Sequence, residues 1–516
     1  MDSDIRASRH EGELGKAEPD PRRWTALIVL GLINFIQVLD VTVVNVALPR
    51  IKEDLGFSQA GLAWVVNSYV IMAGGLLLLG GRLADIFGRR RLFLIGVGVF
   101  AVASAVSGAA VNPGMLVGGR FVQGIGEALA APAALGLIAL IFPDPGERMK
   151  ALGIWGGISG VAGVTGVVIS GVLTDLASWR WLFYINVPIA LLALLMVPRL
   201  VSESRMVREH KRLDFPGAVT ATGGLIAVVY GLLQAAEHPW GSSRVLVPLL
   251  GGLALLAVML LIESRSKDPL IPLRFFHNRT RLVANLVALF FLAGFISYIF
   301  LLTLFEQQVL NFSPLRGGLA YLPFGISMGV GIGLGAGLMP KLGVKPILAA
   351  GFFGAALGLF LTSGIDVGAS YASHVLPGMI VFGLSSGAVA PAIANAALHK
   401  VTGQDASLAS GVQQAVQQVG SALGLAFLVT FALRHAADKV AAGASADAAA
   451  TSGYVLSFRI AAVLMIVAAV LVLILLERVS AQPRNPHMEG AMPNQPESAE
   501  PTPASGSGAE REPSGS

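Results

Sequence analysis

Cysteine is absent from the 516 residues, which excludes disulfide bonds and thiolate metal sites. Charge is scarce as well, since charged residues make up 13% of the chain and about a quarter of a typical soluble domain. The sequence also lacks an ATP-binding loop, and its apolar segments hold no cluster of His, Asp and Glu suited to metal or acid–base chemistry. These absences argue against a disulfide-stabilised secreted protein, an ATP-driven machine and a membrane enzyme.

Long apolar segments dominate what is present. Apolar residues make up 54% of the chain, and the mean hydropathy is +0.71. Segments of about 20 or more apolar residues can only cross a bilayer as helices, because lipid offers no hydrogen bonds to a bare backbone. The 62 glycines fit this reading, since small residues let membrane helices approach closely. We predict an all-α integral membrane protein with fourteen spans near 24–48, 60–82, 92–111, 114–142, 149–173, 181–199, 215–236, 245–263, 282–306, 315–339, 343–364, 371–399, 405–433 and 455–477.

Basic residues are distributed unevenly between the two sides of these spans. Most of the 36 Lys and Arg residues lie on the side that holds both termini, and Arg120 lies inside a span. This asymmetry follows the positive-inside rule, so both termini are expected in the cytoplasm. The basic pI of about 9.5 therefore indicates membrane orientation, and we expect no nucleic-acid partner.

Two polar cytoplasmic loops, 200–214 and 264–281, divide the spans into groups of six, two and six. The segments G-R-L-A-D-I-F-G-R-R-R (81–91) and G-L-M-P-K-L-G-V-K-P (337–346) are short basic loops at matching places in the two groups of six. Such duplication is common in secondary transporters, whose two bundles rock about a central site. The expected organisation is a disordered N-terminus (1–23), a six-helix bundle (24–199), two inserted helices (215–263), a second six-helix bundle (282–477) and a disordered tail (478–516).

Ionisable residues inside spans are rare and are functional candidates by default, because a charge in the bilayer costs at least a few kcal/mol. Asp40 lies in the first span, and Arg120 and Glu127 lie in the fourth. Asp40 either takes up and releases a proton or serves as a structural hydrogen-bonding partner. Arg120, Gln123 and Glu127 share one helix face, so Glu127 is either a functional acid or is neutralised by Arg120. Arg120 itself either orients a carboxylate or holds the conformation through helix contacts. Glu306, at the outer end of the ninth span, is interpreted as an interface residue.

Amides and aromatic residues in several spans suggest a largely apolar cavity with a few polar points, suited to a bulky amphipathic molecule. Taken singly, each of these side chains is better explained by helix packing than by ligand contact. The candidate cavity residues are Asn34, Gln37, Asn67, Gln123, Trp155, Phe295, Tyr298, Gln413 and Gln417. No metal or cofactor site is expected.

The segment at 81–91 resembles the signature loop between the second and third helices of the major facilitator superfamily. The resemblance covers residues 24–477. It implies that this loop governs the switch between inward-open and outward-open states, with Arg89 and Arg90 pairing across the two bundles. The implied switch residues are Gly81, Asp85, Gly88, Arg89 and Arg90.

Three further motifs resemble the 14-helix drug:proton antiporters of this superfamily (EmrB/QacA type). They are L-D-V-T-V-V-N-V-A-L-P (39–49), R-F-V-Q-G-I-G-E-A (120–128) and S-W-R-W-L-F-Y-I-N-V-P (178–188). The resemblance places Asp40 at an acidic position of the first helix and Arg120 at an arginine implicated in proton coupling. The segment G-V-T-G-V-V-I-S-G (163–171) departs from the exporter pattern, with Val167 in place of a proline and Ser170 in place of a glycine.

The resemblance thus implies proton-coupled efflux of amphipathic drugs or antibiotics, with Asp40, Glu127 and Arg120 in the coupling. The alternative is a symporter or facilitator that imports a small metabolite, which the departure at 163–171 favours. Arginine far outnumbers lysine, a bias typical of GC-rich bacterial genomes. We expect a monomer in the bacterial cell membrane whose partners are protons, a small-molecule substrate and lipid.

Overall fold

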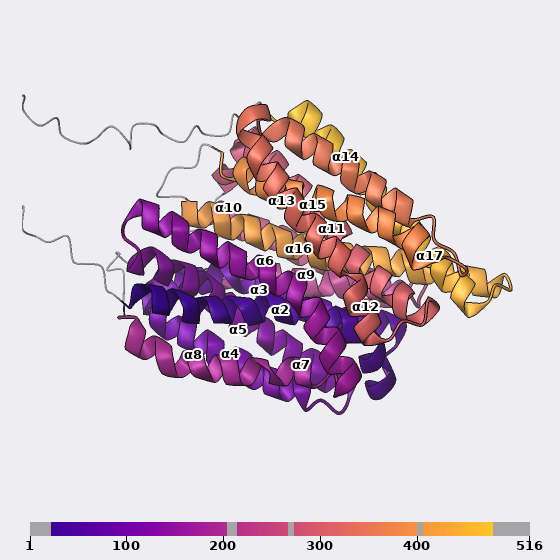
Figure 1. Cartoon of the computed structure of the whole chain (residues 1–516), viewed down its shortest axis with the longest axis horizontal. Coiled ribbons are helices and arrows are strands. Elements are labelled where there is room, and N and C mark those ends of the chain that lie inside the picture. The colour runs from indigo at the N-terminus through magenta and orange to yellow at the C-terminus, as the bar shows by residue number, and fades with distance from the viewer. Residues whose placement is uncertain (1–21, 204–213, 267–272, 400–405, 478–516) are drawn as a thin grey trace, which may run out of the picture.

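The computed structural model describes residues 22–203, 214–266, 273–399 and 406–477, and these ranges are helical with short connections (Figure 1). The predicted ends 1–23 and 478–516 lie almost entirely outside the described residues. The elements are α2 (Arg23–Leu55), α3 (Gln59–Phe87), α4 (Arg89–Gly108), α5 (Pro113–Ile141), α6 (Pro145–Leu176), α7 (Trp181–Tyr184), α8 (Asn186–Leu200), α9 (Phe215–Gln234), α10 (Ser243–Arg265), the 3-10 turn η1 (Leu273–His277), α11 (Arg279–Leu304), the π-helix η2 (Phe305–Val309), α12 (Pro314–Ala320), α13 (Leu322–Leu342), α14 (Val344–Thr362), the π-helix η3 (Tyr371–Val375), α15 (Leu376–Ala397), α16 (Ala406–Ala441) and α17 (Ala446–Leu475).

Among the described residues, thirteen helices are long and apolar enough to cross a membrane. The number rises to fourteen when α6, which bends by 41°, is taken as one span. Several spans join two elements, such as α7 with α8 (Trp181–Leu200) and α12 with α13 (Pro314–Leu342). The predicted all-helical membrane architecture is confirmed.

Helix ends differ from the predicted span ends. The first span was expected to end at residue 48, but α2 continues through Pro49 to Leu55 and stops at Gly56, whose left-handed backbone (φ 72°) caps the helix. The helix α16 runs to Ala441, beyond the expected end at 433. Hydropathy identifies the part of a helix that lies in lipid, whereas caps decide where the helix stops.

The inserted pair α9 and α10 packs together beside α3 and α16 (Figure 1). Glycine makes this close pairing possible, because a Cβ at Gly252 would lie 2.7 Å from the carbonyl oxygen of Gly224. The α16 side of the contact is polar: Thr430 Oγ1 donates to Leu232 O at 2.7 Å, and Arg434 Nη1 donates to Ala235 O at 2.7 Å. Through α9, the inserted pair therefore contacts both groups of six.

Corresponding helix pairs in the two groups are brought together by glycine. In the pair α3–α5, a Cβ at Gly80 would overlap the carbonyl oxygen of Ala128. In the pair α13–α15, a Cβ at Gly331 would overlap the carbonyl oxygen of Leu384. Backbones this close gain van der Waals contact, which is the main attraction between helices in lipid.

Replacement of Gly80 by alanine should therefore force α3 and α5 apart. We expect Gly80→Ala to lower the stability of the detergent-solubilised protein by about 1–3 kcal/mol, seen as a lower thermal unfolding midpoint. Gly98→Ala is the matched control, since no atom lies within 4 Å of a Cβ at Gly98 on α4. Equal midpoints for the two variants would contradict this account of the α3–α5 contact.

Candidate functional site: a buried charge network

An ion pair lies at the centre of the first six spans. Arg120 Nη1 on α5 donates to Asp40 Oδ2 on α2, and the two residues are 1% and 0% exposed. The sequence separates them by 80 residues, and the packing of α2 against α5 brings them together. A buried charge is tolerated only when it is paired and hydrogen-bonded, so each residue requires the other.

The second oxygen of Asp40 is held by two amides. Gln123 Nε2 donates to Asp40 Oδ1 at 3.2 Å, and Asn186 Nδ2 on α8 donates to the same oxygen at 3.0 Å. Ser104 Oγ on α4 accepts from Gln123 at 2.7 Å and from Asn186 at 3.4 Å. Asp40 thus accepts three hydrogen bonds from side chains on two other helices, and all of these groups are buried.

Arg120 is held by more than the carboxylate. Its Nε donates to the carbonyl oxygen of Val65 on α3 at 2.9 Å. Its guanidinium carbon lies 4.3 Å from the ring centroid of Tyr69 and 5.8 Å from that of Phe183. A cation over an aromatic face gains about 2 kcal/mol when desolvated. The guanidinium therefore has favourable contacts that do not depend on Asp40.

Glu127 lies outside this network. Its side chain is 8% exposed, and the buried Oε2 has no hydrogen-bond partner among the described residues. The open question of whether Arg120 neutralises Glu127 has a structural answer: Arg120 pairs with Asp40. An acid without such a pair, two turns along the same face of α5, is available to a proton or a cation.

Asn186 and Ser104 are members of the network that the sequence did not single out. Neutral polar residues are common in membrane helices, so neither stands out as Asp40 and Arg120 do. The one signal for Asn186 is its place in the motif at 178–188, at the start of α8 after the break at Ile185.

The predicted cavity residues are divided between packing and partial exposure. Asn34, Gln37, Asn67, Gln123, Tyr298 and Gln413 are buried, whereas Trp155, Phe295 and Gln417 are half-buried. Asn34 Nδ2 donates to Ser159 Oγ on α6 at 2.6 Å, and Gln123 belongs to the charge network. Tyr298 lies among aromatic rings, with Phe382 at a centroid distance of 4.5 Å. A cavity formed jointly by these residues stays a prediction.

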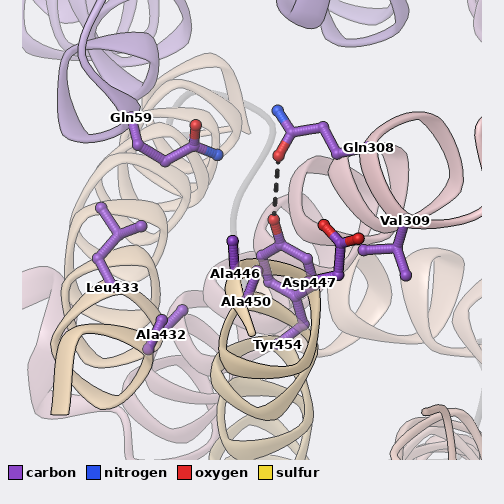
Figure 2. A pocket seen from close by; sticks show the side chains of 10 residues that line it. Gln59, Gln308, Val309, Ala432, Leu433, Ala446, Asp447, Ala450 and Tyr454 are labelled. Atoms are coloured by element: carbon purple, nitrogen blue, oxygen red, sulfur yellow. Dashed lines mark hydrogen bonds between the residues drawn. The ribbon is translucent and has the colours of Figure 1, made fainter. Parts of the chain in front are cut away.

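Two cavities that the structure does contain lie near the outer ends of the spans. The first holds about 190 Å³ between α3, η2, α16 and α17 and is drawn in Figure 2, where the Tyr454 hydroxyl donates to Gln308 Oε1 at 3.4 Å. The second holds about 360 Å³ and is lined by residues of the segment after α14, of α16 and of α17, among them Ile365, His435 and Arg459. Neither is lined by any of the predicted cavity residues.

The signature loop forms a compact cluster within the first half. Arg89 donates to Asp85 Oδ1 at 2.9 Å and to Gly136 O on α5 at 3.0 Å. Arg90 donates to Val201 O at 3.1 Å and lies 3.7 Å from Glu203. The expected pairing of Arg89 and Arg90 across the two bundles is wrong for this conformation, because these partners all precede residue 204.

Gly81 and Gly88 occupy different settings in this loop. Gly88 has a positive φ of 102° and separates α3 from α4, which is the tight turn that glycine permits. Gly81 lies inside α3, beside Pro132 of α5. Only Gly88 makes the turn.

The two halves contact each other along α3 and α16 and at their outer ends. Gln307 Nε2 on η2 donates to Val46 O on α2 at 2.8 Å. A Cβ at Gly171 on α6 would lie 2.7 Å from the carbonyl oxygen of Pro314 on α12. Towards the cytoplasm, nothing lies within 4 Å of a Cβ at Gly153, Gly156 or Gly157 of α6. Figure 1 shows α6 beside α12. The outer side is therefore closed.

Removal of the Asn186 amide should weaken the hold on Asp40. We expect Asn186→Ala to lower stability by about 1.5–3 kcal/mol, because the lost bond is to a charged group. Asn395→Ala is the control, since the exposed Asn395 amide donates only within its own helix, to Pro391 O. Thermal unfolding in detergent compares the two, and equal midpoints would show that Asn186 does not support the ion pair.

Several curated proteins are similar to this chain over most of their length. The puromycin resistance protein of Streptomyces alboniger is 40% identical over 397 residues, which are 76% of this chain and 78% of that protein. The lincomycin resistance protein of Streptomyces lincolnensis is 38% identical, with 76% and 81% covered. The cephamycin export protein of Amycolatopsis lactamdurans is 37% identical, with 78% and 84% covered.

Solved structures share the fold. The inward-open xylose transporter of E. coli matches with a TM-score of 0.61 at 15% identity, over 89% of this chain and 98% of that one. An inward-facing bacterial homologue of the lysosomal transporter Spinster matches with a TM-score of 0.61 at 17% identity, over 88% and 96%. The family model described as Major Facilitator Superfamily matches residues 30–425. With these matches and the relatives above, the chain belongs to the major facilitator superfamily.

Proposed function

We propose that this protein exports amphipathic drugs or antibiotics across the bacterial cell membrane in exchange for protons. It is a multi-pass membrane transporter and not an enzyme. The resistance and export proteins at 37–40% identity support drug efflux. The observation that supports proton exchange is the buried pair of Asp40 and Arg120, a carboxyl in mid-span that can gain or lose a proton only when its partner moves.

In this mechanism Asp40 alternates between two partners. While Arg120 and the two amides hold it, Asp40 stays ionised, because a proton would displace a charged hydrogen bond. When substrate binding or a shift of α5 separates the pair, the carboxylate becomes an unpaired buried charge and takes up a proton. Val65 O and Gln123 still accept hydrogen bonds from Arg120, so the guanidinium remains solvated by protein during this step.

The proton gradient supplies enough energy for such a cycle. One proton moving through about 180 mV of combined driving force releases roughly 4 kcal/mol. At about 1.4 kcal/mol for each tenfold ratio, that sustains roughly a thousandfold gradient of a neutral compound.

Substrate would contact Glu127 and the half-buried side chains among the predicted cavity residues. Glu127 offers a carboxylate to a cationic compound, and Trp155, Phe295 and Gln417 offer aromatic and amide surface. The bundles 24–199 and 282–477 would rock about this region, with the loop at 81–91 steadying one end of the first bundle. We propose that the transporter acts as a monomer, since each chain holds both bundles.

Import by symport is the second candidate, and the departure at 163–171 favours it. The altered residue Ser170 makes a contact between helices, because its Oγ donates to the carbonyl oxygen of Val43 on α2. The neighbouring Gly166 and Gly171 still pack closely, against Thr42 and against α12. Because α6 keeps its contacts in spite of the altered motif, export stays the better-supported direction.

Replacement of Asp40 by asparagine tests the coupling. Asp40→Asn should abolish uphill, pH-gradient-dependent accumulation of puromycin or ethidium inside inside-out vesicles, the direction that corresponds to export from the cell, since the side chain no longer binds a proton. The same vesicles should still exchange labelled for unlabelled compound, because exchange needs no net proton movement. Gradient-driven export at the rate of the native protein would remove Asp40 from the mechanism.

Glu127→Gln tests the proposed cation contact. We expect export of the cation ethidium to fall about tenfold or more relative to a neutral compound, because a charge-assisted contact adds about 1.5–3 kcal/mol. The measurement is the ratio of the two export rates in one vesicle preparation. Equal losses for both compounds would contradict a role of Glu127 in recognising charge.

A further inference from the structure

Glu306 is a second buried acid, and the proton-coupling mechanism above does not use it. It is the second residue of the π-helix η2, which continues α11 at the outer end of the span. Glu306 was interpreted as an interface residue at the outer end of the ninth span, but its side chain is 0% exposed and lies inside the protein. Neither carboxyl oxygen has a hydrogen-bond partner among the described residues. A π-turn inside a helix is uncommon and frequently marks a functional position.

Three tyrosines lie close enough to Glu306 to be affected by its charge. They are Tyr298 on α11, Tyr321 before α13 and Tyr371 on η3. Their hydroxyls are engaged elsewhere: Tyr321 with Thr303 Oγ1 at 2.9 Å, Tyr371 with Ala320 O at 2.6 Å and Tyr298 with Thr362 Oγ1 at 3.4 Å. Among the ion pairs of the described residues, none includes Glu306.

An ionised carboxylate in this setting would be costly. Burial of a charge without a partner costs several kcal/mol or more, whereas the neutral acid loses only its hydrogen bonds to water. The arrangement in this structure therefore requires the neutral, protonated form of Glu306. Asp40 differs, because it has Arg120 beside it.

The position of Glu306 connects its proton to the contact between the halves. The next residue, Gln307, makes the hydrogen bond to Val46 O of α2 across the outer end. After η2, the chain turns at Asn311 (φ 54°) and begins α12 at Pro314, which lies against Gly171 of α6. If the outer ends separated, the contacts of Gln307 with α2 and of Pro314 with α6 would be lost, and water would reach the first turn of η2.

We propose that Glu306 is a proton-binding site that controls the outer contact. The outer ends close once this carboxyl has taken a proton from the external water, and they are held open while it is ionised. The sign follows from burial: acid outside favours the closed outer end seen here, and alkaline medium favours opening. The inference rests on alternating access by the two halves and holds for either direction of transport.

The absence of native cysteine makes a direct test simple. Val46→Cys places one thiol in the outer contact, where the native side chain is 1% exposed. Labelling from outside with a membrane-impermeant maleimide then reports opening. Ala442→Cys, exposed between α16 and α17, corrects for the pH dependence of thiol reactivity and shows that each variant is present and correctly oriented. Rates are measured between about pH 8 and about pH 5.

With Glu306 intact, the corrected labelling of the Val46→Cys variant should fall by about threefold or more as the external pH drops through the range in which Glu306 takes up its proton. With Glu306→Gln added, labelling should be low and independent of pH. Glu263→Gln, which neutralises another buried acid on α10, should keep the native slope. Gln307→Ala should raise labelling at every pH and also keep the slope.

A native pH slope in Glu306→Gln would overturn the proposal, as would equal loss of slope in Glu263→Gln. Because the readout is accessibility, it stands apart from the export assays. If no tested compound were exported, the labelling result would still stand. If the pH slope of labelling were unaltered in Glu306→Gln, the proposal that Asp40 couples export to protons would not be affected.

Discussion

Five of the six spans in the first half are arranged around one electrostatic constraint, which is that Asp40 and Arg120 are buried away from water together. The pair draws in α2 and α5 directly, α3 through Val65, α4 through Ser104 and α8 through Asn186. To move any one of these helices alone would leave a buried charge or amide without a partner, at a cost of several kcal/mol. The first half is therefore best treated as a rigid body, and conformational change must occur where it meets the second half. The contacts there are few polar bonds and close glycine packing, which can slide or separate at lower cost.

The sequence predicted the membrane fold well because the hydropathy of a segment depends only on the residues of that segment. Fourteen apolar segments correspond to the helices of the structure, with α6 bent. Asp40 and Arg120 were also detectable, since a charge inside an apolar run is unusual wherever its partner lies. Asn186 was not, because its importance comes from a contact with Asp40 across 146 residues, and a neutral amide in a helix has no distinguishing pattern. Glu306 was interpreted as an interface residue for a related reason: the apolar run ends there, and the sequence does not show that the side chain is buried in the π-helix η2.

The signature loop shows what a motif leaves undetermined. Its residues specify a set of donors and acceptors, but several partners can satisfy them. In this structure, with the outer ends in contact, Arg89 and Arg90 bind Gly136, Val201 and Glu203 of their own half. The expected pairing across the bundles requires the inner ends to approach. The motif therefore specifies the donors, and in this conformation their acceptors come from the first half.

The two halves hold their acids in opposite ways, and this difference has a mechanistic consequence. Asp40 has a fixed cation beside it, so in the proposed mechanism it accepts a proton only after a helix or a ligand disturbs the pair. Glu306 has no such cation among the described residues, so in the proposal above water at its own turn decides whether it holds a proton. The first proposed proton site therefore depends on events in the centre of the protein, and the second depends on the opening of the outer end. A transporter with both devices can require a proton from outside before the outer end closes, and can still make the use of the central proton depend on the cargo.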